Sequence, residues 1–275
     1  MNPRLKRKLI NELKHNRSAQ LAIVVLVILI LLSIIAPLIA RDPNLINVRV
    51  KNQSPSLEYW FGTDALGRDY FARALYGGRV SLMVGILTVV ISTLIGTTIG
   101  VLSAYFGGII DNVLMRIVDI LMSVPNFFLI VILNTYLKPG LMNVILILGF
   151  FSWMSLSRIV RSQTLALKKM SFIEYSQAIG TPRGYIIKQL MVNNIPTIIV
   201  SATLSIGGAI LTESSLSFFG LGVAQPNSSW GNMLGDARGA LLTAPHLAII
   251  PGLLILITVM SFNRIGEVLR RAFAK

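Results

Sequence analysis

Few side chains in this sequence have the types and the spacing that catalysis or cofactor binding requires. No glycine is followed by a lysine, so the phosphate-binding loop in which a Gly-Lys pair contacts a nucleotide is missing. The only two histidines are His15 and His246. The topology argued below places them on opposite sides of a membrane, so we expect two interfacial side chains rather than a zinc pair. The chain contains no cysteine, which excludes disulfides, thiolate metal sites and cysteine nucleophiles. We therefore predict no catalytic residue and no metal site.

Two acidic residues lie in apolar surroundings. Glu213 is notable because an ionisable group at membrane depth is costly and by default raises a functional question. It lies near the expected outer end of its apolar run, so we favour a structural role, in which it hydrogen-bonds the turn at 214–222, over substrate contact. Asp119 follows Arg116 by three residues, and we expect these two side chains to pair on one face of a helix.

Small and hydroxylated residues are concentrated in two apolar runs. Gly96-x-x-x-Gly100 is a close-packing signature of membrane helices. The other small and hydroxylated residues of these runs are Ser92, Thr93, Thr97, Thr98, Ser103, Ser201, Thr203, Ser205, Gly207, Gly208 and Thr212. We interpret the glycines as packing positions. The hydroxyl groups suit either helix packing or a polar path for a substrate, and the sequence leaves both alternatives open.

The elements that carry these residues are predicted to be membrane helices. The 275 residues are 54% hydrophobic and 13% charged, whereas a soluble domain has roughly 25% charged residues. A helix needs about 20 apolar residues to cross roughly 30 Å of hydrocarbon. Six runs of about this length occur, at about 19–40, 80–105, 113–137, 141–160, 194–219 and 245–263. The first run is too long for a cleavable signal peptide. The predicted fold class is therefore an all-α polytopic membrane protein with six transmembrane helices.

The basic residues predict the orientation of these helices. The net charge is +14, but lysines and arginines flank the apolar runs without interleaved aromatic residues, so we expect no nucleic-acid partner. Short cytoplasmic loops and tails carry an excess of basic residues. Three groups would share one face of a six-helix protein: Arg4, Lys6, Arg7, Lys8, Lys14 and Arg17; Arg158, Arg161, Lys168, Lys169, Arg183 and Lys188; Arg264, Arg270, Arg271 and Lys275. The other face keeps Lys138, Arg238 and the mixed charges of 41–79. We therefore predict that both termini and the loop at 161–193 are cytoplasmic.

This cytoplasmic loop is too long for a simple helix connection, for which two to eight residues are usual. Three bulky side chains share one face of a predicted short helix: Phe172, Tyr175 and Ile179. Gly180 permits a sharp reversal, and Thr181 followed by Pro182 is typical of the N-cap and first position of a second short helix. Such a pair suits insertion into a groove of a partner protein. A helix lying flat on anionic lipid would explain the same pattern.

The loop resembles a known motif. The segment Glu174-Tyr-Ser-Gln-Ala-Ile-Gly180 is similar to the "EAA" loop of ABC importer permeases, whose pattern is Glu-Ala-Ala, three residues and Gly. Tyr175 and Ser176 replace the two alanines, and Asn193 stands about where many relatives have proline, although Pro196 follows closely. The resemblance implies that contacts with an ATPase subunit involve Phe172, Glu174, Tyr175, Ala178, Ile179 and Gly180.

Further segments resemble the family of peptide and nickel permeases. Phe61-Gly-Thr-Asp-Ala-Leu-Gly-Arg-Asp69 and Gly78-Arg-Val-Ser-Leu82 are similar to the segment before its second helix. Glu213-Ser-Ser-Leu-Ser-Phe-Phe-Gly-Leu-Gly-Val223 and Ser229-Trp-Gly-Asn-Met233 are similar to its late signature, in the C-type permease of each pair. The signature positions are Gly62, Thr63, Asp64, Gly67, Arg68, Asp69, Glu213, Gly220, Gly222, Trp230 and Gly231. The resemblance covers nearly the whole chain, in order.

This resemblance implies a non-catalytic subunit with the type I ABC importer permease fold, in the cytoplasmic (inner) membrane of a bacterium. Residues 1–75 would form a cytoplasmic tail, a first helix and an external segment, and residues 76–270 the shared core, with the coupling loop at 161–193. The implied partners are a homologous B-type permease, two cytoplasmic ATPases, an external substrate-binding protein and the lipid bilayer. This chain would bind no cofactor, while the ATPases would use ATP and Mg²⁺. Family members carry dipeptides, oligopeptides, nickel or metal chelates; we expect peptides, with nickel or a metal chelate as the alternative.

Two other functional classes have signatures that this sequence lacks. An ion-driven secondary transporter usually has midplane carboxylates or broken helices, often in inverted repeats, and the sequence has no clear internal repeat and no mid-membrane carboxylate pair. A membrane enzyme would need a nucleophile and a base in one site, and we find no such constellation. Both classes are therefore less well supported than the importer permease.

Overall fold

The computed structural model describes residue 8 and residues 12–137 and 140–273, and in these ranges it is almost entirely helical. An isolated bridge between Thr63 and Asp69 is the one β-type pairing of the described residues. Five helices are long and apolar enough to cross a membrane: α2 (Arg17–Ile39), α3 (Tyr70–Phe106), α6 (Leu141–Lys168), α8 (Arg183–Phe218) and α10 (His246–Phe273). The predicted all-α membrane fold is confirmed, and these helices correspond to five of the six predicted runs.

The remaining run, predicted as one helix at 113–137, is broken. It consists of α4 (Gly108–Ser123) and α5 (Asn126–Tyr136), which are bent by 81° relative to each other. The break lies at Val124 and Pro125, where Val124 is extended with ψ 131°. Proline has no N–H for a helical hydrogen bond and disfavours the helical conformation in the preceding residue. The described residues therefore contain five helices that could each span a bilayer, or six candidate spans when the bent pair is taken as one.

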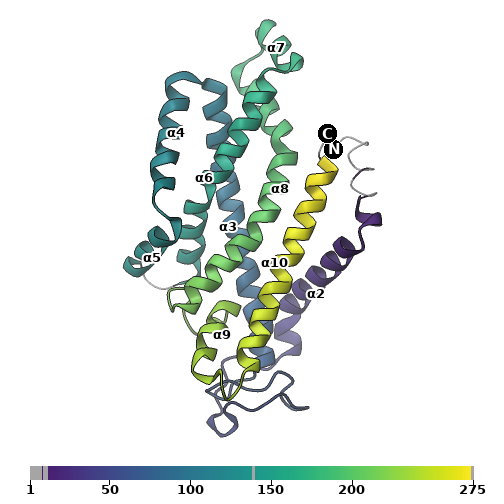
Figure 1. The fold of residues 1–275 in the computed structure, drawn as a ribbon, viewed down its shortest axis with the longest axis vertical. Coiled ribbons are helices and arrows are strands. Elements are labelled where there is room, and N and C mark those ends of the chain that lie inside the picture. Colours follow the sequence, from purple (N-terminus) through teal and green to yellow (C-terminus); the bar gives the residue numbers. More distant parts are fainter. Residues whose placement is uncertain (1–7, 9–11, 138–139, 274–275) are drawn as a thin grey trace.

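Helix α3 lies at the centre of the bundle and packs mainly against α6 and α8 (Figure 1). Helices α2 and α10 lie together on one side, and α4 and α5 on the other (Figure 1). The α3–α6 contact is close at the predicted Gly-x-x-x-Gly pair. A Cβ atom on Gly96 would lie 2.8 Å from the carbonyl oxygen of Trp153, and one on Gly100 2.6 Å from that of Ser157. Glycine at both positions lets the two backbones approach, as the packing interpretation predicted.

The two ends of the bundle differ in what they carry. The start of α2, the end of α10 and the short helix α7 (Ser171–Ala178) lie toward one end, and α9 (Trp230–Ala237) lies at the other with residues 40–69 (Figure 1). This arrangement agrees with an even number of crossings. His15 lies just before α2, whereas His246 begins α10 at the end that carries α9. Five basic residues used in the orientation argument lie outside the described residues: Arg4, Lys6, Arg7, Lys138 and Lys275.

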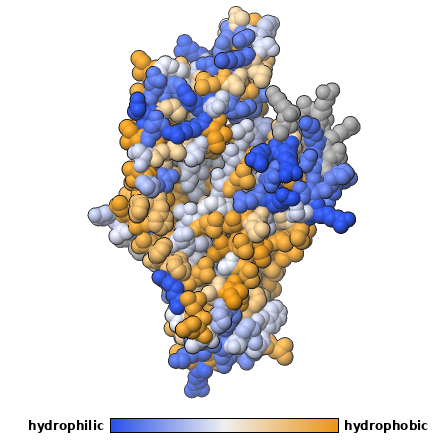
Figure 2. All heavy atoms as spheres, viewed as in Figure 1, coloured by the Kyte–Doolittle hydropathy of each residue, from blue (hydrophilic) through white to orange (hydrophobic). Residues whose placement is uncertain are grey.

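The surface has the polarity that a bilayer requires. On the face that Figure 2 shows, apolar side chains form a band across the middle of the molecule, and hydrophilic side chains gather toward its two ends. Large apolar side chains of the long helices, such as Leu94, Phe150 and Leu253, are exposed by 65%, 54% and 48%. Exposure of this kind is stable only in contact with hydrocarbon or with another protein surface.

Ion pairs at the α7 end join helices that are far apart in the sequence. The Arg161 guanidinium donates two hydrogen bonds to Asp111, from Nε at 2.6 Å and from Nη2 at 2.5 Å. Asp119 accepts a hydrogen bond from Arg158 of α6, so the predicted pairing of Asp119 with Arg116 is wrong. Because α4 and α6 lie side by side, Asp119 can reach the guanidinium of Arg158 across the interface. The alternative pair with Arg116 on the same helix would contribute only a few tenths of a kcal/mol.

Candidate functional site

A polar groove opens between α3, α5, α6 and α8. Its volume is about 430 Å³, and no charged side chain is among the residues that line it. Hydroxyl and amide groups enter it from all four helices: Thr88, Asn126, Ser152, Ser155, Ser205 and Thr212. Apolar side chains such as Phe127 and Leu211 cover the rest of the wall. A groove of this composition can bind an uncharged or internally neutralised ligand by hydrogen bonds and apolar contact.

Two adjacent glycines show how α8 serves packing and the groove at once. A Cβ atom on Gly207 would lie 3.2 Å from Val259 Cγ1 of α10, so this glycine packs against a neighbouring helix. Nothing lies within 4 Å of a Cβ atom on Gly208, which lines the groove. The expectation that all the glycines are packing positions is therefore wrong for Gly208, because helical rotation turns neighbouring residues about 100° apart.

The hydroxyl groups of the groove differ in how they are satisfied. Thr212 Oγ1 donates to the carbonyl of Gly208 at 2.9 Å, and Ser152 Oγ to the carbonyl of Leu148 at 2.6 Å. Thr88 Oγ1 is buried and has no hydrogen-bond partner among the described residues. An unsatisfied buried hydroxyl costs about 1–3 kcal/mol. Thr88 is fully buried, so a ligand or water would reach this hydroxyl only if neighbouring side chains moved.

The connection between α6 and α8 is shorter than the loop predicted at 161–193. Helix α6 continues to Lys168 and α8 begins at Arg183, so the loop proper is 169–182 with α7 inside it. The predicted second short helix is the first part of α8, and Pro182 is its N-cap residue rather than its first helical position. Ile186 and Leu190 are buried in this part, and their packing lets the helix continue without a break into the bilayer.

Helix α7 lies at the tip of the molecule (Figure 1). Ile173 and Ser176 face inward and are buried, whereas Phe172, Tyr175 and Ile179 are exposed by 40%, 67% and 61%. The other loop residues predicted to contact a partner are exposed as well: Glu174, Ala178 and Gly180. All six predicted positions are therefore gathered on one protrusion. Large apolar side chains exposed at such a tip are typical of a protein–protein contact.

The C-terminal end of α7 is a Schellman motif centred on Gly180. Gly180 has φ +73°. Its N–H donates to the carbonyl of Gln177 at 3.1 Å, and the Thr181 N–H donates to the carbonyl of Ser176 at 3.0 Å. These are the two hydrogen bonds of this motif, which needs a left-handed residue at the position that Gly180 occupies. The reversal expected at Gly180 is thus present, and it sets the direction in which the chain returns to α8.

The late signature positions hold α9 against the bundle. Glu213 is fully buried, and its carboxylate accepts a hydrogen bond from Ser217 Oγ at 2.6 Å. Ser217 Oγ in turn accepts from the Val223 N–H at 3.2 Å, so Glu213 supports the turn after α8 as we expected. The remaining positions act by close packing or backbone conformation: Gly220 has φ +77°, and a Cβ atom would clash with Ser217 at Gly222 and with Ser214 at Gly231.

Trp230 joins α9 to α3. It is almost fully buried. Its backbone N–H donates to Ser81 Oγ at 3.1 Å, and its indole Nε1–H donates to the carbonyl of Ala74 at 2.9 Å. Both donors of this tryptophan are therefore satisfied by the first half of α3.

A buried charge cluster anchors the segment 40–69. Asp64 Oδ2 accepts from Arg68 Nε at 2.7 Å and from Arg73 Nη1 at 2.6 Å. Asp236 of α9 accepts from Arg73 Nη2 at 3.1 Å. Asp64, Arg68 and Arg73 are exposed by only 3%, 7% and 2%. Burial raises the pKa of Asp236, an effect that the positive charge of Arg68 opposes. Asp236 also lies 3.5 Å from Arg68 Nη2. Its contacts with the two arginines are longer than those of Asp64, and it is more exposed, so Asp64 is the main counter-charge of both.

The other early signature positions shape the same segment. Gly62 and Gly67 have positive φ angles of 76° and 72°. Thr63 Oγ1 accepts from the Gln53 N–H at 2.9 Å, and Asp69 caps α3 by accepting from the Ala72 N–H at 3.1 Å. The segment before α3 is therefore a folded unit rather than a loose connection.

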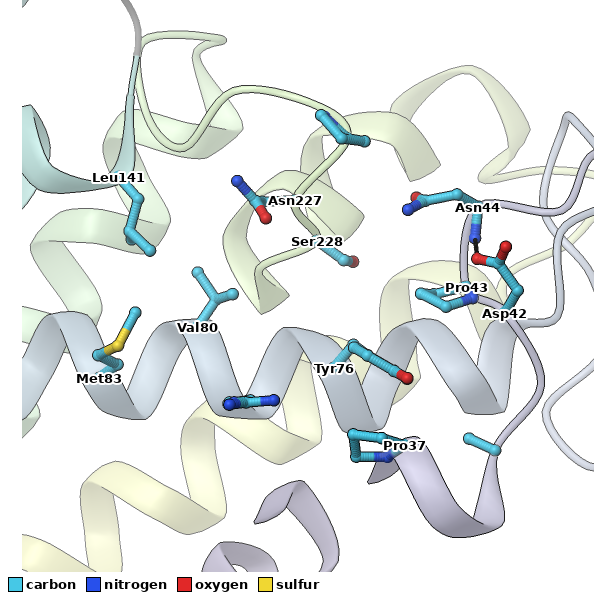
Figure 3. Close-up of a pocket in the computed structure, with 13 residues that line it drawn as sticks. Pro37, Asp42, Pro43, Asn44, Tyr76, Val80, Met83, Leu141, Asn227 and Ser228 are labelled. Carbon is cyan, nitrogen blue, oxygen red and sulfur yellow. Dashed lines mark hydrogen bonds between the residues drawn. The ribbon is translucent and has the colours of Figure 1, made fainter. Parts of the chain in front are cut away.

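A second cavity, of about 650 Å³, lies at the α9 end between α3, the end of α2 and residues 226–228 (Figure 3). Tyr76, Asn44 and Asn227 line it (Figure 3). Arg79 also lines it and is exposed. Ser228 Oγ is buried and has no hydrogen-bond partner among the described residues. The cavity therefore offers several polar groups to a ligand or a partner surface.

Sequence reasoning missed the groove residues of α5 and α6. Asn126 follows Pro125 directly, and Ser152 and Ser155 are three residues apart within an apolar run. A spacing of three places two side chains on the same side of a helix. That spacing could have indicated a polar face on this helix. Whether the face points into a groove or toward another helix follows only from the packing of the bundle.

Comparison with known proteins gives two family matches. Residues 96–275 match the model described as "Binding-protein-dependent transport system inner membrane component". Residues 7–55 match "N-terminal TM domain of oligopeptide transport permease C".

Individual relatives are similar over most of the chain. The oligopeptide transport system permease protein OppC of Bacillus subtilis is 37% identical over 261 residues, which are 94% of this chain and 86% of the relative. The dipeptide transport system permease protein DppC of Alkalihalophilus pseudofirmus is 37% identical over 268 residues, 97% and 88% of the two chains. The glutathione transport system permease protein GsiD of Pectobacterium atrosepticum is 40% identical over 222 residues, 80% and 74% of the two chains.

Proposed function

This chain belongs to the family of binding-protein-dependent transport system inner membrane components, and from that premise we propose that its polar groove forms part of a translocation path for peptides. A permease of this family is a non-catalytic membrane component, and the ATPase is a separate subunit. The observation that carries the proposal is the uncharged groove of about 430 Å³ between α3, α5, α6 and α8. In this proposal a homologous B-type permease supplies the other wall of the path.

We propose peptides as the substrate class of the groove. Peptide groups offer both N–H donors and carbonyl acceptors, which hydroxyl and amide side chains such as those of Ser205 and Asn126 can pair. The names of the relatives refer to oligopeptides, dipeptides and glutathione. The alternative is the same role in a nickel or metal-chelate importer. Uptake of labelled peptides and of nickel by cells with and without this chain distinguishes the two.

We propose that α7 couples the permease to a cytoplasmic ATPase. The exposed side chains of Phe172, Tyr175 and Ile179 suit a groove of a partner. Closure of two ATPases around ATP and Mg²⁺ would draw the α7 helices of both permeases together. Movement of α7 would reach the groove through α6 and α8, which begin or end at this loop.

We assign both termini and α7 to the cytoplasm of a bacterium, the chain to its inner membrane, and α9 with residues 40–69 to the outside, where a substrate-binding protein would dock. We also propose a division near residue 75 into an N-terminal part, 1–75, and a core, 76–270. The second cavity then lies on the external side, where substrate would arrive.

The topology can be tested with single cysteines, because the chain contains none. Leu57 and Tyr175 are exposed by 99% and 67%. In intact spheroplasts a membrane-impermeant maleimide is expected to label Leu57→Cys and not Tyr175→Cys. After permeabilisation of cells that lack the ATPase subunits, whose proposed contact would cover Tyr175, both variants should be labelled, and the cysteine-free protein gives the background. Labelling of both positions in intact spheroplasts would contradict the topology.

The groove can be tested by filling it. Gly208→Leu is expected to lower substrate uptake at least about ten-fold, since the added side chain projects into the open groove and even about 1.4 kcal/mol of added barrier corresponds to ten-fold. Gly208→Ala is the matched control, because a Cβ atom alone meets nothing within 4 Å. Membrane abundance and recovery of the partner permease are measured for both. Wild-type uptake by an abundant Gly208→Leu protein would rule out this groove as part of the path.

A further inference from the structure

An apolar groove of about 450 Å³ runs between α2 and α10, on the side of the bundle away from α4 and α5. Leu21 and Val25 of α2 and Ile257 and Met260 of α10 line it, with Ala22 between the helices. Leu21 and Met260 are exposed by 64% and 61%. Helix α2 is the most apolar span, with a mean hydropathy of 3.3, and only 22% of that window is buried. The groove is therefore open to the hydrocarbon of the bilayer.

One end of this groove is polar and carries a cation. Ser18, Ser261 and Arg264 line it. Arg264 donates from Nε to Ser18 Oγ at 2.7 Å, from Nη1 to Glu267 at 3.3 Å and from Nη2 to Asn16 Oδ1 at 3.4 Å. A guanidinium group has five N–H donors. One N–H on each terminal nitrogen of Arg264 therefore has no partner among the described residues.

The surroundings of this polar end are basic. Lys14 and Arg17 precede or begin α2, and Arg270 and Arg271 follow Arg264 on α10. Two acidic side chains, Glu12 and Glu267, lie in the same stretches. Five basic side chains against two acidic ones leave a local net charge of +3. Figure 2 shows a strongly hydrophilic region at the start of α2, directly beside the apolar band.

We propose that this groove binds one anionic phospholipid of the surrounding bilayer, with an acyl chain between α2 and α10 and the phosphate at Arg264. Ser18 and Val25 are seven residues apart, which corresponds to about 10 Å along the helix axis. This length fits within one leaflet, about half of the roughly 30 Å hydrocarbon core. The phosphate oxygens accept from the two remaining N–H groups of Arg264, and planar guanidinium groups suit phosphate geometry.

The charge of the site selects the headgroup. Basic residues at the membrane surface attract anionic lipids, and each contributes a factor of about five to binding. A zwitterionic lipid would gain the same apolar contacts, but its headgroup has no net charge and so would not gain this electrostatic contribution to its affinity. This lipid site lies at the seam between α2 and the core, and it does not depend on which substrate is transported.

Native mass spectrometry of the full chain in detergent tests the site. The protein is titrated with phosphatidylglycerol or with phosphatidylcholine of identical acyl chains. The first phosphatidylglycerol is expected to bind at least about five-fold more tightly. Arg264→Gln should lower this preference about five-fold, because it removes one basic residue, and it should also weaken phosphatidylcholine binding, because both lipids carry the phosphate that Arg264 contacts. Arg264→Lys keeps the charge and should keep the preference, and Arg183→Gln, an exposed arginine of α8 outside the groove, should have no effect.

A second variant tests the apolar part independently of Arg264. Leu21→Trp fills the groove and leaves the hydrogen bonds of Arg264 in place, so it should weaken the first binding step of both lipids several-fold. Equal affinity of the wild-type protein for both lipids would overturn the proposal, as would an undiminished preference for phosphatidylglycerol in Arg264→Gln. If Arg264→Gln fails to fold, unchanged lipid binding by Leu21→Trp would overturn it instead.

Discussion

Replacing Asp64 with alanine is expected to destabilise the protein by about 3–5 kcal/mol, because it leaves two buried guanidinium groups without their main counter-charge. Asp64 accepts one hydrogen bond from Arg68 and one from Arg73, and all three side chains are less than a tenth exposed. The carboxylate also accepts from the backbone N–H groups of Leu66 and Arg68, at 2.9 and 3.0 Å. One substitution therefore removes four hydrogen bonds.

The expected consequence is release of the segment 40–69 from α3 and α9. Thermal unfolding of the purified chain in detergent, together with its abundance in membranes, measures the effect. Glu58→Ala is the matched control. Its carboxylate is 3.9 Å from Arg41 in an exposed pair, and such pairs contribute at most about 1 kcal/mol. An Asp64→Ala protein as stable as Glu58→Ala would show that the buried cluster does not hold the segment.

The long apolar runs were sufficient to predict most of the fold. Hydropathy and length determine insertion, so the sequence alone was enough to locate α2, α3, α6, α8 and α10. It was not enough to locate the limits of these helices, because a helix continues past the hydrocarbon wherever its residues still pack. Helix α8 begins at Arg183, about eleven residues before its apolar run, since Ile186 and Leu190 are buried there.

The break in the remaining run shows another limit. Hydropathy averages over a window, so the sequence Ser-Val-Pro-Asn at 123–126 left the run apolar overall. The local rule on proline and its preceding residue was the better guide at this point. The break has a functional consequence, because it turns α5 and places Asn126 in the wall of the groove.

The groove and the ion pairs depend on contacts that spacing does not encode. Asp119 and Arg158 are 39 residues apart, and Asp111 and Arg161 are 50 apart. For a helix that is apolar all round, the hydrophobic pattern does not tell which face contacts lipid and which contacts protein. The opposite roles of Gly207 and Gly208 follow from the position of α10 alone.

Gly180→Val is expected to lower transport at least about five-fold while the bundle still inserts. Gly180 has φ +73°, a conformation that costs roughly 1–2 kcal/mol for a residue with a Cβ atom. Nothing lies within 4 Å of that Cβ position, so the strain arises from the backbone and not from a clash. A penalty of this size reduces the ratio of native to rearranged loop by a factor of roughly 5–30.

The effect is local because the Schellman motif joins only α7 to the start of α8. Losing its two hydrogen bonds, from Gly180 and Thr181, would turn the tip that carries Phe172 and Tyr175. The transmembrane helices keep their apolar runs and flanking charges, which determine insertion. Membrane abundance should therefore stay normal, while ATPase recovered with the permease and substrate uptake both fall.

Two variants separate backbone strain from the mere addition of a side chain. Gly184→Val places the same side chain in open space four residues later, where φ is not left-handed, and should transport almost normally. Gly180→Asn should be intermediate, because asparagine tolerates the left-handed region better than valine does. Normal uptake and normal ATPase recovery by Gly180→Val would mean that α7 is not the coupling element. Loss of abundance in Gly180→Val but not in Gly184→Val would assign the motif a role in folding instead.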